Sequence, residues 1–373
     1  MIQFIDLGAQ QKRIRDRVKL RVNAVLDHGH YIMGPEVQEL EVQLASYIGT
    51  KHCITCSSGT DALLMVLMAH GVGPGDAILT TPFTFISTVE VIMLLGARPL
   101  FVDIDPRTYN IDPNKISEAI KDALKDNQYK VKGILPVDLF GLPANYPEIE
   151  AIAAEYGLWV LEDGAQSFGG SINGQKACSF GNAAATSFFP AKPLGCYGDG
   201  GAIFTNDDSL ADIVTSIRVH GKGENKYDNV CIGLNGRLDT LQAAVLLEKL
   251  MIIDEEWAKK DIIADRYEEL LDGMVTTPII PDDFLSAWAY YSVLTESEQK
   301  RKELMTLLKK QDIPTAVYYP KPLHFQQVSS HLGYNKGDFP VAENVSSRIF
   351  SLPMHAYLED DDLVKIANVF QGV

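Results

Sequence analysis

The stretch SFFPAKPLG at residues 187–195 carries a single lysine, Lys192, between an apolar run typical of a β-strand and a glycine-rich segment. Earlier in the chain, another apolar run leads into EDGAQS at residues 162–167, which puts Asp163 and Gln166 at a strand end. In an open parallel sheet, ligands bind at the carboxyl ends of the strands. The two stretches together therefore predict a cofactor site.

The order of the apolar runs predicts an α/β fold. Between residues 50 and 205, short apolar runs alternate with helical patterns, which is typical of parallel strands joined by crossover helices. From residue 239 to residue 271 the pattern becomes long and helical, and we expect a second domain to start within it. The expected strands lie at residues 52–56, 77–80, 99–102, 133–137, 158–161, 183–188 and 202–205.

The chain is expected to divide into a large domain over residues 1–250 and a small C-terminal domain over residues 251–373. The acidic run at residues 359–362 fits the first turn of a last helix, because negative charge complements the helix dipole there. The elements expected in the small domain are a strand at residues 289–294 and helices at residues 297–311, 340–350 and 359–370.

Composition excludes several classes of protein. The 373 residues are 46% hydrophobic and 22% charged, which is ordinary for a soluble globular protein. The formal net charge of -16 argues against a nucleic-acid-binding surface, which needs a basic patch. Neither a bilayer-spanning apolar stretch nor the pattern of a signal peptide is present, so we expect no membrane partner and a cytoplasmic location.

The five cysteines are an odd number in a large chain, which favours reduced thiols over a disulfide framework. Cys53 and Cys56 have the spacing of a redox or zinc motif. However, they lie in a strand-like run, and the other cysteines supply no second close pair. We therefore expect buried structural thiols and no metal site.

A phosphate cradle is predicted at residues 57–63, SSGTDAL, where a strand gives way to a helix. Backbone N–H groups and the Thr60 hydroxyl can face an anion at such a helix N-terminus. The segment could instead provide only an N-cap, since a Ser or Thr before a helix is commonly just a cap.

One cofactor, pyridoxal 5'-phosphate, would use all six candidate side chains near the strand ends, which are Thr60, Phe85, Asp163, Gln166, Ser187 and Lys192. Its aldehyde condenses with a lysine amine, its pyridine nitrogen works as an electron sink when protonated, and its phosphate requires donors. Asp163 would keep the ring nitrogen protonated, and Lys192 would form the Schiff base and then act as a general base. Gln166 would contact the ring hydroxyl. Taken alone, Phe85 could stack on the ring or belong to the core, and Ser187 could be a strand hydroxyl bonded to the backbone.

The chain resembles the DegT/DnrJ/EryC1/StrS sugar aminotransferases over nearly its whole length. This resemblance implies the fold of the fold-type I, aspartate-aminotransferase-like enzymes: a large domain with a mostly parallel central sheet and a smaller α+β domain. The segments that carry it are GPEV at 34–37, SGTDAL at 58–63, TPFTF at 81–85, EDGAQS at 162–167, SFFPAKPLG at 187–195 and GLNGRLD at 233–239.

The resemblance also implies roles for individual residues. Lys192 carries the Schiff base and Asp163 pairs with the pyridinium nitrogen, while Gln166 meets the ring oxygen and Phe85 stacks on the ring. Asn235 is expected to reach the phosphate held by the neighbouring subunit, which implies a homodimer with shared active sites. The residues expected to hold the phosphate of the same subunit are Gly59, Thr60 and Ser187.

Within the family, the segment at residues 187–201 is most similar to aminotransferases of UDP-2-acetamido-2-deoxy-3-oxo-glucuronate, which serve surface polysaccharides such as the lipopolysaccharide O-antigen. L-Glutamate is the expected amine donor. Arg237 could clamp the uronate carboxylate with two hydrogen bonds, or it could form a structural ion pair with an acid such as Asp239. The alternative substrate is a 4-keto or 3-keto deoxy sugar linked to dTDP or UDP.

Two other functions compete with the aminotransferase. A nicotinamide-dependent oxidoreductase would need an early Gly-x-Gly-x-x-Gly turn between a strand and a helix, whereas the glycines here come late. A non-catalytic or regulatory protein with the same fold is disfavoured by the intact Lys192 and Asp163. His220 and His324 could be substrate contacts or structural residues, and neither is required by the lysine mechanism.

Overall fold

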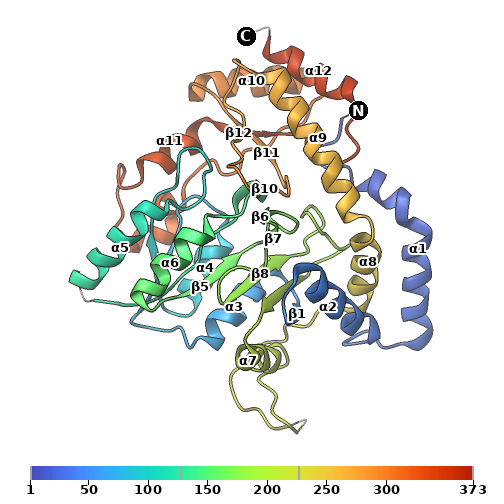
Figure 1. Cartoon of the computed structure of the whole chain (residues 1–373), viewed down its shortest axis with the longest axis vertical. Helices are drawn as coiled ribbons and strands as arrows, with labels where there is room; N and C mark the ends of the chain where they lie inside the picture. The colour runs from blue at the N-terminus through green and yellow to red at the C-terminus, as the bar shows by residue number, and fades with distance from the viewer. Residues whose placement is uncertain (1, 127, 226, 372–373) are drawn as a thin grey trace.

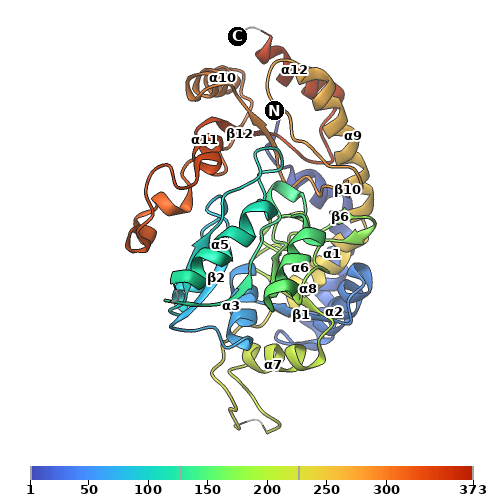
Figure 2. The same cartoon turned by 60° about the vertical axis from the view of Figure 1, so that its left-hand side comes forward.

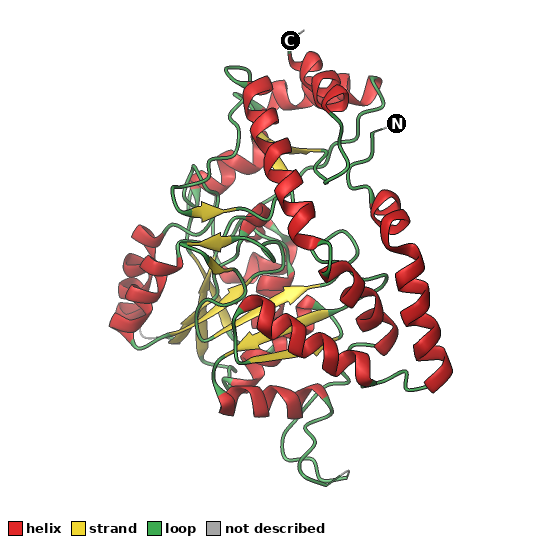
Figure 3. Ribbon diagram, turned by 45° about the vertical axis from the view of Figure 1, so that its right-hand side comes forward, coloured by secondary structure: helices red, strands yellow, loops and turns green. Residues whose placement is uncertain are grey.

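The computed structural model describes residues 2–126, 128–225 and 227–371. In this part of the chain, a seven-stranded sheet lies at the centre of the large domain and helices pack on both of its faces (Figures 1 and 3). The strand order is β1-β9-β8-β5-β4-β2-β3. The strands are β1 His52–Cys56, β2 Asp76–Thr80, β3 Arg98–Phe101, β4 Lys130–Ile134, β5 Trp159–Asp163, β8 Ala183–Ser187 and β9 Gly201–Thr205.

The sheet is mostly parallel, as expected, but β9 runs the other way. It pairs antiparallel with both β1 and β8, whereas the pairs β2–β3, β2–β4, β4–β5 and β5–β8 are parallel. The prediction of a parallel strand at residues 202–205 was therefore wrong. The chain between β8 and β9 contains no crossover helix, and neighbouring strands joined without one run antiparallel.

Alternation along the strands divides the apolar side chains between two cores. Leu161 and Ile203 face one side and pack with α3 Gly59–Ala69, α4 Ser87–Leu94 and α7 Asp208–Arg218. Val160 and Phe204 face the other side. The helices of that side are α2 Pro35–Ile48, α5 Pro113–Asp126, α6 Tyr146–Tyr156 and α8 Thr240–Leu250, and α1 Leu7–His28 packs against α8 (Figure 2).

The C-terminal part of the chain has its own apolar core, which also includes Ile2 from the start of the chain. Both ends of the chain lie beside this core in Figure 1. We propose that the small domain begins after α8, at residue 251. Its elements are α9 Ile253–Leu271, β11 Tyr291–Leu294, α10 Glu298–Lys310, η2 Leu323–Phe325, η3 Gln327–Leu332, α11 Pro340–Arg348, β12 Ile349–Leu352 and α12 Asp360–Phe370.

Two expectations for this region can be compared directly with the structure. The helix expected at residues 340–350 ends at Arg348, because Ile349–Leu352 forms β12 and pairs antiparallel with β11. The last helix does begin in the acidic run, where Glu359 and Asp362 form a reciprocal capping box. Short strands that the sequence pattern did not predict form a separate three-stranded sheet: β6 Ser171–Ile172, β7 Gln175–Lys176 and β10 Phe284–Leu285.

Asp103, after β3, ties the small domain to the large one. Its carboxylate accepts hydrogen bonds from the N–H groups of Val341 (3.0 Å) and Ala342 (2.9 Å). These are first-turn donors of α11, which have no partner within the helix, and an anion there also complements the helix dipole. The carboxylate therefore fixes α11, and the segment before it, above the carboxyl ends of the strands.

The cysteines are reduced, and Cys53 and Cys56 are both buried. Cys231 is exposed, so the expectation of a buried thiol was wrong there, because this residue lies in a loop that extends from the large domain. No cluster of three potential metal ligands occurs among the residues that the structure describes. In the same residues, no helix has the length and apolar character needed to cross a bilayer.

Candidate active site

Asp163 is the last residue of β5 and points toward the side of the sheet that α4 covers. The hydroxyl of Thr88, in α4, donates a hydrogen bond of 2.8 Å to its Oδ2, and the Ala165 N–H donates one of 3.3 Å to its Oδ1. The residue is 5% exposed, and burial raises the pKa of its carboxyl, although these two hydrogen bonds and the charge of Lys192 oppose the shift. The site therefore provides a buried carboxylate with only part of its hydrogen-bonding capacity used.

Gln166 follows in the same turn, and its amide is oriented from both sides. Its Oε1 accepts a hydrogen bond of 2.8 Å from the N–H of Phe140, which lies in η1 Leu139–Gly141. Its Nε2 donates to the hydroxyl of Tyr319, 3.2 Å away in the small domain. The N–H of Phe140 thus fixes which end of the amide is the donor, and that end faces the region where the two domains meet.

Lys192 lies in the loop after β8, where its own N–H donates to the carbonyl of Phe189 at 2.9 Å. Burial lowers the pKa of its amine to about 8, and the opposing charge of Asp163 limits the shift. A lysine with this pKa is partly neutral near pH 7, unlike an exposed one. A neutral amine is the form that attacks an aldehyde carbon.

At the predicted phosphate cradle, the expected Ser or Thr cap is Ser58. The Ser58 hydroxyl accepts a hydrogen bond of 3.0 Å from the Asp61 N–H, and α3 begins at Gly59. Thr60 is therefore inside the first turn, and its hydroxyl lies 2.8 Å from that of Ser87. Within the described chain the N–H groups of Gly59 and Thr60 have no protein partner, which leaves them for an anion.

Gly59 and Ser187 lie in direct contact. A Cβ on Gly59 would come within 2.7 Å of the Ser187 Cβ, which no real side chain tolerates. The end of β8 and the start of α3 can approach this closely only because residue 59 lacks a side chain. The hydroxyl of Ser187 is thereby placed beside the free N–H groups of the helix.

Phe85 does not belong to the core. Its side chain is 53% exposed, and its ring centroid lies 6.2 Å from that of Tyr319. A large exposed aromatic ring beside the site fits a stacking role better than a packing role.

Asn235 and Arg237 face a cavity whose lining does not include Lys192. This cavity of about 420 Å³ is also lined by Ser57, Asp199 and other residues. The Nε atom of Arg237 is buried and has no hydrogen-bond partner among the described residues, where no ion pair with Asp239 occurs either. The cavity adjoins the cradle, because the Ser57 N–H donates to the carbonyl of Gly236 at 3.0 Å.

The two histidines have structural contacts. His324 is buried, with its Nε2 3.2 Å from Glu343 Oε1 and its ring centroid 4.0 Å from that of Phe325. His220 has a positive φ of 60°, and its carbonyl accepts a hydrogen bond of 2.8 Å from Asn229. The imidazole of His324 is therefore held in local packing, whereas His220 contributes its backbone and its side chain is exposed.

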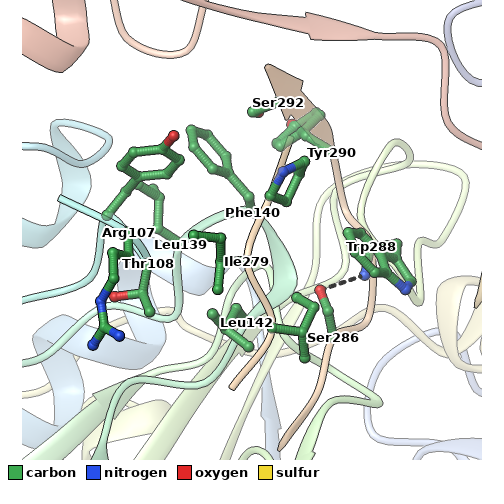
Figure 4. A pocket seen from close by; sticks show the side chains of 13 residues that line it. Arg107, Thr108, Leu139, Phe140, Leu142, Ile279, Ser286, Trp288, Tyr290 and Ser292 are labelled. Carbon is green, nitrogen blue, oxygen red and sulfur yellow. Dashed lines mark hydrogen bonds between the residues drawn. The ribbon is translucent and has the colours of Figure 1, made fainter. Parts of the chain in front are cut away.

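A small cavity of about 20 Å³ lies where strand-end loops of the large domain meet the small domain (Figure 4). Phe140, the residue whose N–H orients Gln166, lines it on one side, and Tyr290 and Trp288 line it on the other. Its volume is that of about one water molecule, too small for a sugar. The junction is therefore tightly packed behind Gln166.

Sequence reasoning missed two residues of the site, Thr88 and Tyr319. Thr88 lies three residues after Phe85, the last residue of the TPFTF motif. This spacing of about one helical turn was the only signal in the sequence that Thr88 could face the same site. Tyr319 belongs to the proline-rich segment YYPKP at residues 318–322, whose approach to Gln166 depends on how the two domains pack.

The donor set fits pyridoxal 5'-phosphate. This cofactor presents groups that match a buried carboxylate, an oriented amide and an amine with a lowered pKa. Its phosphate matches the helix N-terminus at Gly59, where the missing side chain lets Ser187 lie close. Fold and site together define a pyridoxal-phosphate-dependent enzyme.

Comparison with known proteins gives the family. Residues 12–371 match the model of the DegT/DnrJ/EryC1/StrS aminotransferase family. A relative from Pseudomonas aeruginosa, UDP-2-acetamido-2-deoxy-3-oxo-D-glucuronate aminotransferase, is 48% identical over 360 residues, which cover 96% of each protein.

Two solved structures agree with this result. A DegT/DnrJ/EryC1/StrS aminotransferase from Brucella abortus is 50% identical and superposes with a TM-score of 0.97, over 100% of this chain and 99% of that one. NtdA from Bacillus subtilis, with the cofactor PMP bound, is 30% identical with a TM-score of 0.87, over 99% and 83%. The chain belongs to the DegT/DnrJ/EryC1/StrS aminotransferase family. It is a pyridoxal-phosphate-dependent sugar aminotransferase, and the expected fold is confirmed.

Proposed function

We propose that this enzyme transfers the amino group of L-glutamate to the 3-keto carbon of a UDP-linked 2-acetamido uronate. The relative from Pseudomonas aeruginosa, named for such a substrate, supports this proposal because it is similar over almost the whole chain. The single observation in the structure that carries the proposal is that Arg237 has a hydrogen-bond donor that the described residues leave unsatisfied. Its guanidinium group has a buried nitrogen without a protein partner beside an open cavity.

A uronate carboxylate would satisfy this arginine. A guanidinium group binds a carboxylate through two parallel hydrogen bonds, and it does so best where water is excluded. A neutral deoxy sugar offers only hydroxyl and carbonyl oxygens, which accept weaker hydrogen bonds than a carboxylate and do not match the planar fork. The arginine therefore favours a uronate over the alternative 3-keto or 4-keto deoxy sugars linked to dTDP or UDP.

The side chains around Asp163 then have defined tasks. Bound pyridoxal 5'-phosphate supplies an electrophilic aldehyde carbon and a ring that accepts electrons. The carboxylate of Asp163 holds a proton on the ring nitrogen, and Gln166 Nε2 donates toward the ring oxygen. The Nζ atom of Lys192 would hold the aldehyde carbon, with loss of water, and its free amine would serve as the general base that carries protons. Gly59, Thr60 and Ser187 hold the phosphate, and Phe85 covers the ring.

We also propose a homodimer in which Asn235 completes the phosphate site of the partner. The loop between α7 and α8 extends away from the large domain (Figure 1). Its side chains Val230 and Ile232 are 65% and 84% exposed, which is unfavourable for apolar groups unless another protein surface covers them. Asn235 itself is exposed at the end of the same loop.

The pathway and location form the last part of the proposal. A 2,3-diamino uronate linked to UDP is a precursor for a surface polysaccharide such as the O-antigen of lipopolysaccharide, and we propose that it is made in the cytoplasm.

The substrate proposal is tested with purified enzyme, L-glutamate and three keto sugars. The sugars are a UDP-3-keto uronate, the matching UDP-3-keto hexose without the carboxylate, and a dTDP-4-keto deoxy sugar. The proposal expects kcat/KM to be highest for the uronate, and the matched hexose isolates the contribution of the carboxylate. Equal or better turnover of either neutral sugar would overturn the substrate proposal and leave the aminotransferase class intact. A protein that binds the cofactor and aminates none of the three would support the regulatory alternative.

A further inference from the structure

Two carboxyl groups that the mechanism does not use, Asp138 and Glu162, lie buried directly behind the cofactor site. Both residues are 0% exposed. Glu162 precedes Asp163 in β5, so strand alternation turns its side chain to the opposite face of the sheet. Asp138 lies beyond the end of β4, beside β5, and its N–H donates to the carbonyl of Asp163 at 3.1 Å.

Protein groups surround both side chains. Asp138 Oδ1 accepts hydrogen bonds from the Ala144 N–H (2.9 Å) and the Tyr146 hydroxyl (2.8 Å), and its Oδ2 accepts one from the Ser167 hydroxyl (2.6 Å). The two oxygens of Glu162 accept hydrogen bonds from the N–H groups of Cys178 (2.5 Å) and Phe180 (2.9 Å). The parallel bridge between Val137 and Asp163 places Asp138 and Glu162 on the same face of neighbouring strands, and each carboxyl group shifts the pKa of the other.

A hydrogen bond between two carboxyl groups requires one of them to carry a proton, because two carboxylates have no donor between them. Asp138 accepts three hydrogen bonds from other groups and Glu162 accepts two, so Asp138 is the better site for the negative charge. We propose that Glu162 is held as a neutral acid that donates its proton to the carboxylate of Asp138, and that this pair positions the turn carrying Asp163 and Gln166.

The ionisable groups around the pair agree with a single shared charge. Burial raises the pKa of the Glu162 carboxyl, and the charge of Asp138 raises it further. Tyr146, on α6, and Cys178, after β7, also have raised pKa values, so both face the pair as neutral groups. Asp163 and Lys192 lie on the other side of β5. A second full charge on Glu162 would repel the carboxylate of Asp163 across the strand.

The connection from the pair to the site runs through two contacts. Ser167, which donates to Asp138, directly follows Gln166 and ends the turn that begins at Asp163. Phe140, two residues after Asp138, donates its N–H to Gln166. Asp138 therefore holds the turn through Ser167, and it lies two residues before the N–H that orients the Gln166 amide. Asp138 and Glu162 act on the site through these contacts, as positioning residues.

Infrared spectroscopy tests whether Glu162 carries a proton, using the full-length protein with saturating pyridoxal phosphate at pH 7.5. The carbonyl stretch of a protonated carboxyl group should be present in the wild type and in Glu155→Gln, a control that removes an exposed glutamate of α6, and absent in Glu162→Gln.

The pH dependence of the free energy of unfolding is a second test of the proton on Glu162. Folded Glu162 retains a proton that the unfolded chain releases above its ordinary pKa, so the wild type should lose stability relative to Glu162→Gln as pH rises from 5.5 to 8.5. Identical spectra and parallel stability curves for wild type and Glu162→Gln would overturn the proposal.

Positioning is tested by the dissociation constant of pyridoxal phosphate, which does not depend on which sugar is aminated. Glu162→Ala removes the donor to Asp138 and should weaken cofactor binding roughly tenfold, as should Ser167→Ala. Glu162→Gln, whose amide can still donate to Asp138 but leaves one of the N–H groups of Cys178 and Phe180 without its acceptor, should restore part of the affinity lost in Glu162→Ala. The binding experiment rests on the proposed roles of Asp163 and Gln166, whereas the infrared band does not. A failure of the proposed function can therefore be distinguished from a failure of the proposed proton on Glu162. If Glu162→Gln binds as weakly as Glu162→Ala, or Glu162→Ala binds as tightly as wild type, positioning by a donated proton is wrong.

Discussion

The hydroxyl of Thr88 donates a hydrogen bond of 2.8 Å to Oδ2 of Asp163 and thereby joins α4 to the end of β5. A hydrogen bond to a carboxylate favours its charged form, and here it opposes the burial that raises the pKa of Asp163. In the proposed function, Asp163 holds a proton on the ring nitrogen of the cofactor only while it is ionised. Thr88 would then support catalysis without touching the reacting atoms.

Replacing Thr88 by valine removes this donor at almost constant volume. We expect the pKa of Asp163 to rise further and kcat to fall roughly tenfold, the value of one hydrogen bond to a charged group. Steady-state kinetics measures the effect, and Thr215→Val, an exposed position on α7, is the control. An unchanged kcat in Thr88→Val would contradict this role.

Lys192→Ala should abolish both half-reactions and leave the melting temperature near that of the wild type. In the wild type, the rate at which cofactor-free enzyme captures pyridoxal phosphate should rise with pH and become level above about 8, because the attacking amine is neutral above its lowered pKa. Stopped-flow absorbance from pH 6 to 10 measures this rate. A rate that keeps rising toward pH 10.5 would show an ordinary lysine, and multiple turnovers by Lys192→Ala would exclude it as the essential base.

Gly59→Ala should weaken the binding of the cofactor phosphate. The new Cβ would come within 2.7 Å of the Ser187 Cβ and force the helix start away from β8. Such overpacking costs about 1–3 kcal/mol, so the dissociation constant of pyridoxal phosphate should rise roughly tenfold or more. Gly73→Ala is the matched control, because its Cβ would meet no atom within 4 Å. Equal affinities of the two variants would refute the cradle.

Arg237→Ala should reduce kcat/KM for the UDP-3-keto uronate by roughly 10- to 100-fold, the value of charge-assisted hydrogen bonds. The loss should be smaller for the matched neutral hexose, since its hydroxyl accepts a weaker, uncharged hydrogen bond from the guanidinium group. Arg237→Lys should recover only part of the activity, because an ammonium group lacks the planar fork. The carboxylate clamp is excluded if the variant handles the uronate as well as the wild type does.

Mixing two inactive variants tests the shared site. In a heterodimer of Lys192→Ala and Asn235→Asp subunits, one site combines an intact Lys192 with an intact Asn235 from the partner. Refolding the two together should therefore restore activity that neither variant shows alone. Absence of complementation, with heterodimers confirmed by differential tagging, would mean that Asn235 serves its own subunit.

Much of the large domain followed from the sequence because its signals are local. The apolar runs before Asp163 and Lys192 are short and bounded by polar residues or glycines, so the strands could be predicted within a few residues. The direction of β9 could not, because it depends on which strand it pairs with rather than on its own residues. Likewise Ile349–Leu352 continues the pattern of α11, and only its pairing with β11 makes it a strand.

The sequence indicated the place of side chains that follow their own strand, and it missed side chains that reach the region from elsewhere. Asp163, Gln166 and Lys192 are of the first kind, and their roles stay predictions. Tyr319 reaches Gln166 from the proposed small domain, so its contact depends on how distant segments pack. The sequence also allowed a Ser or Thr cap before α3, and only the backbone shows that this cap is Ser58.

The measurement that tests the central claim most directly is an absorbance spectrum of the enzyme with pyridoxal phosphate, followed by L-glutamate and then by the UDP-3-keto uronate. The account predicts that the band of the lysine-bound cofactor is lost with glutamate and returns with this sugar. A band that is lost with glutamate but returns only with a 4-keto sugar would contradict the proposed substrate. A band that does not respond to glutamate would contradict the proposed amine donor.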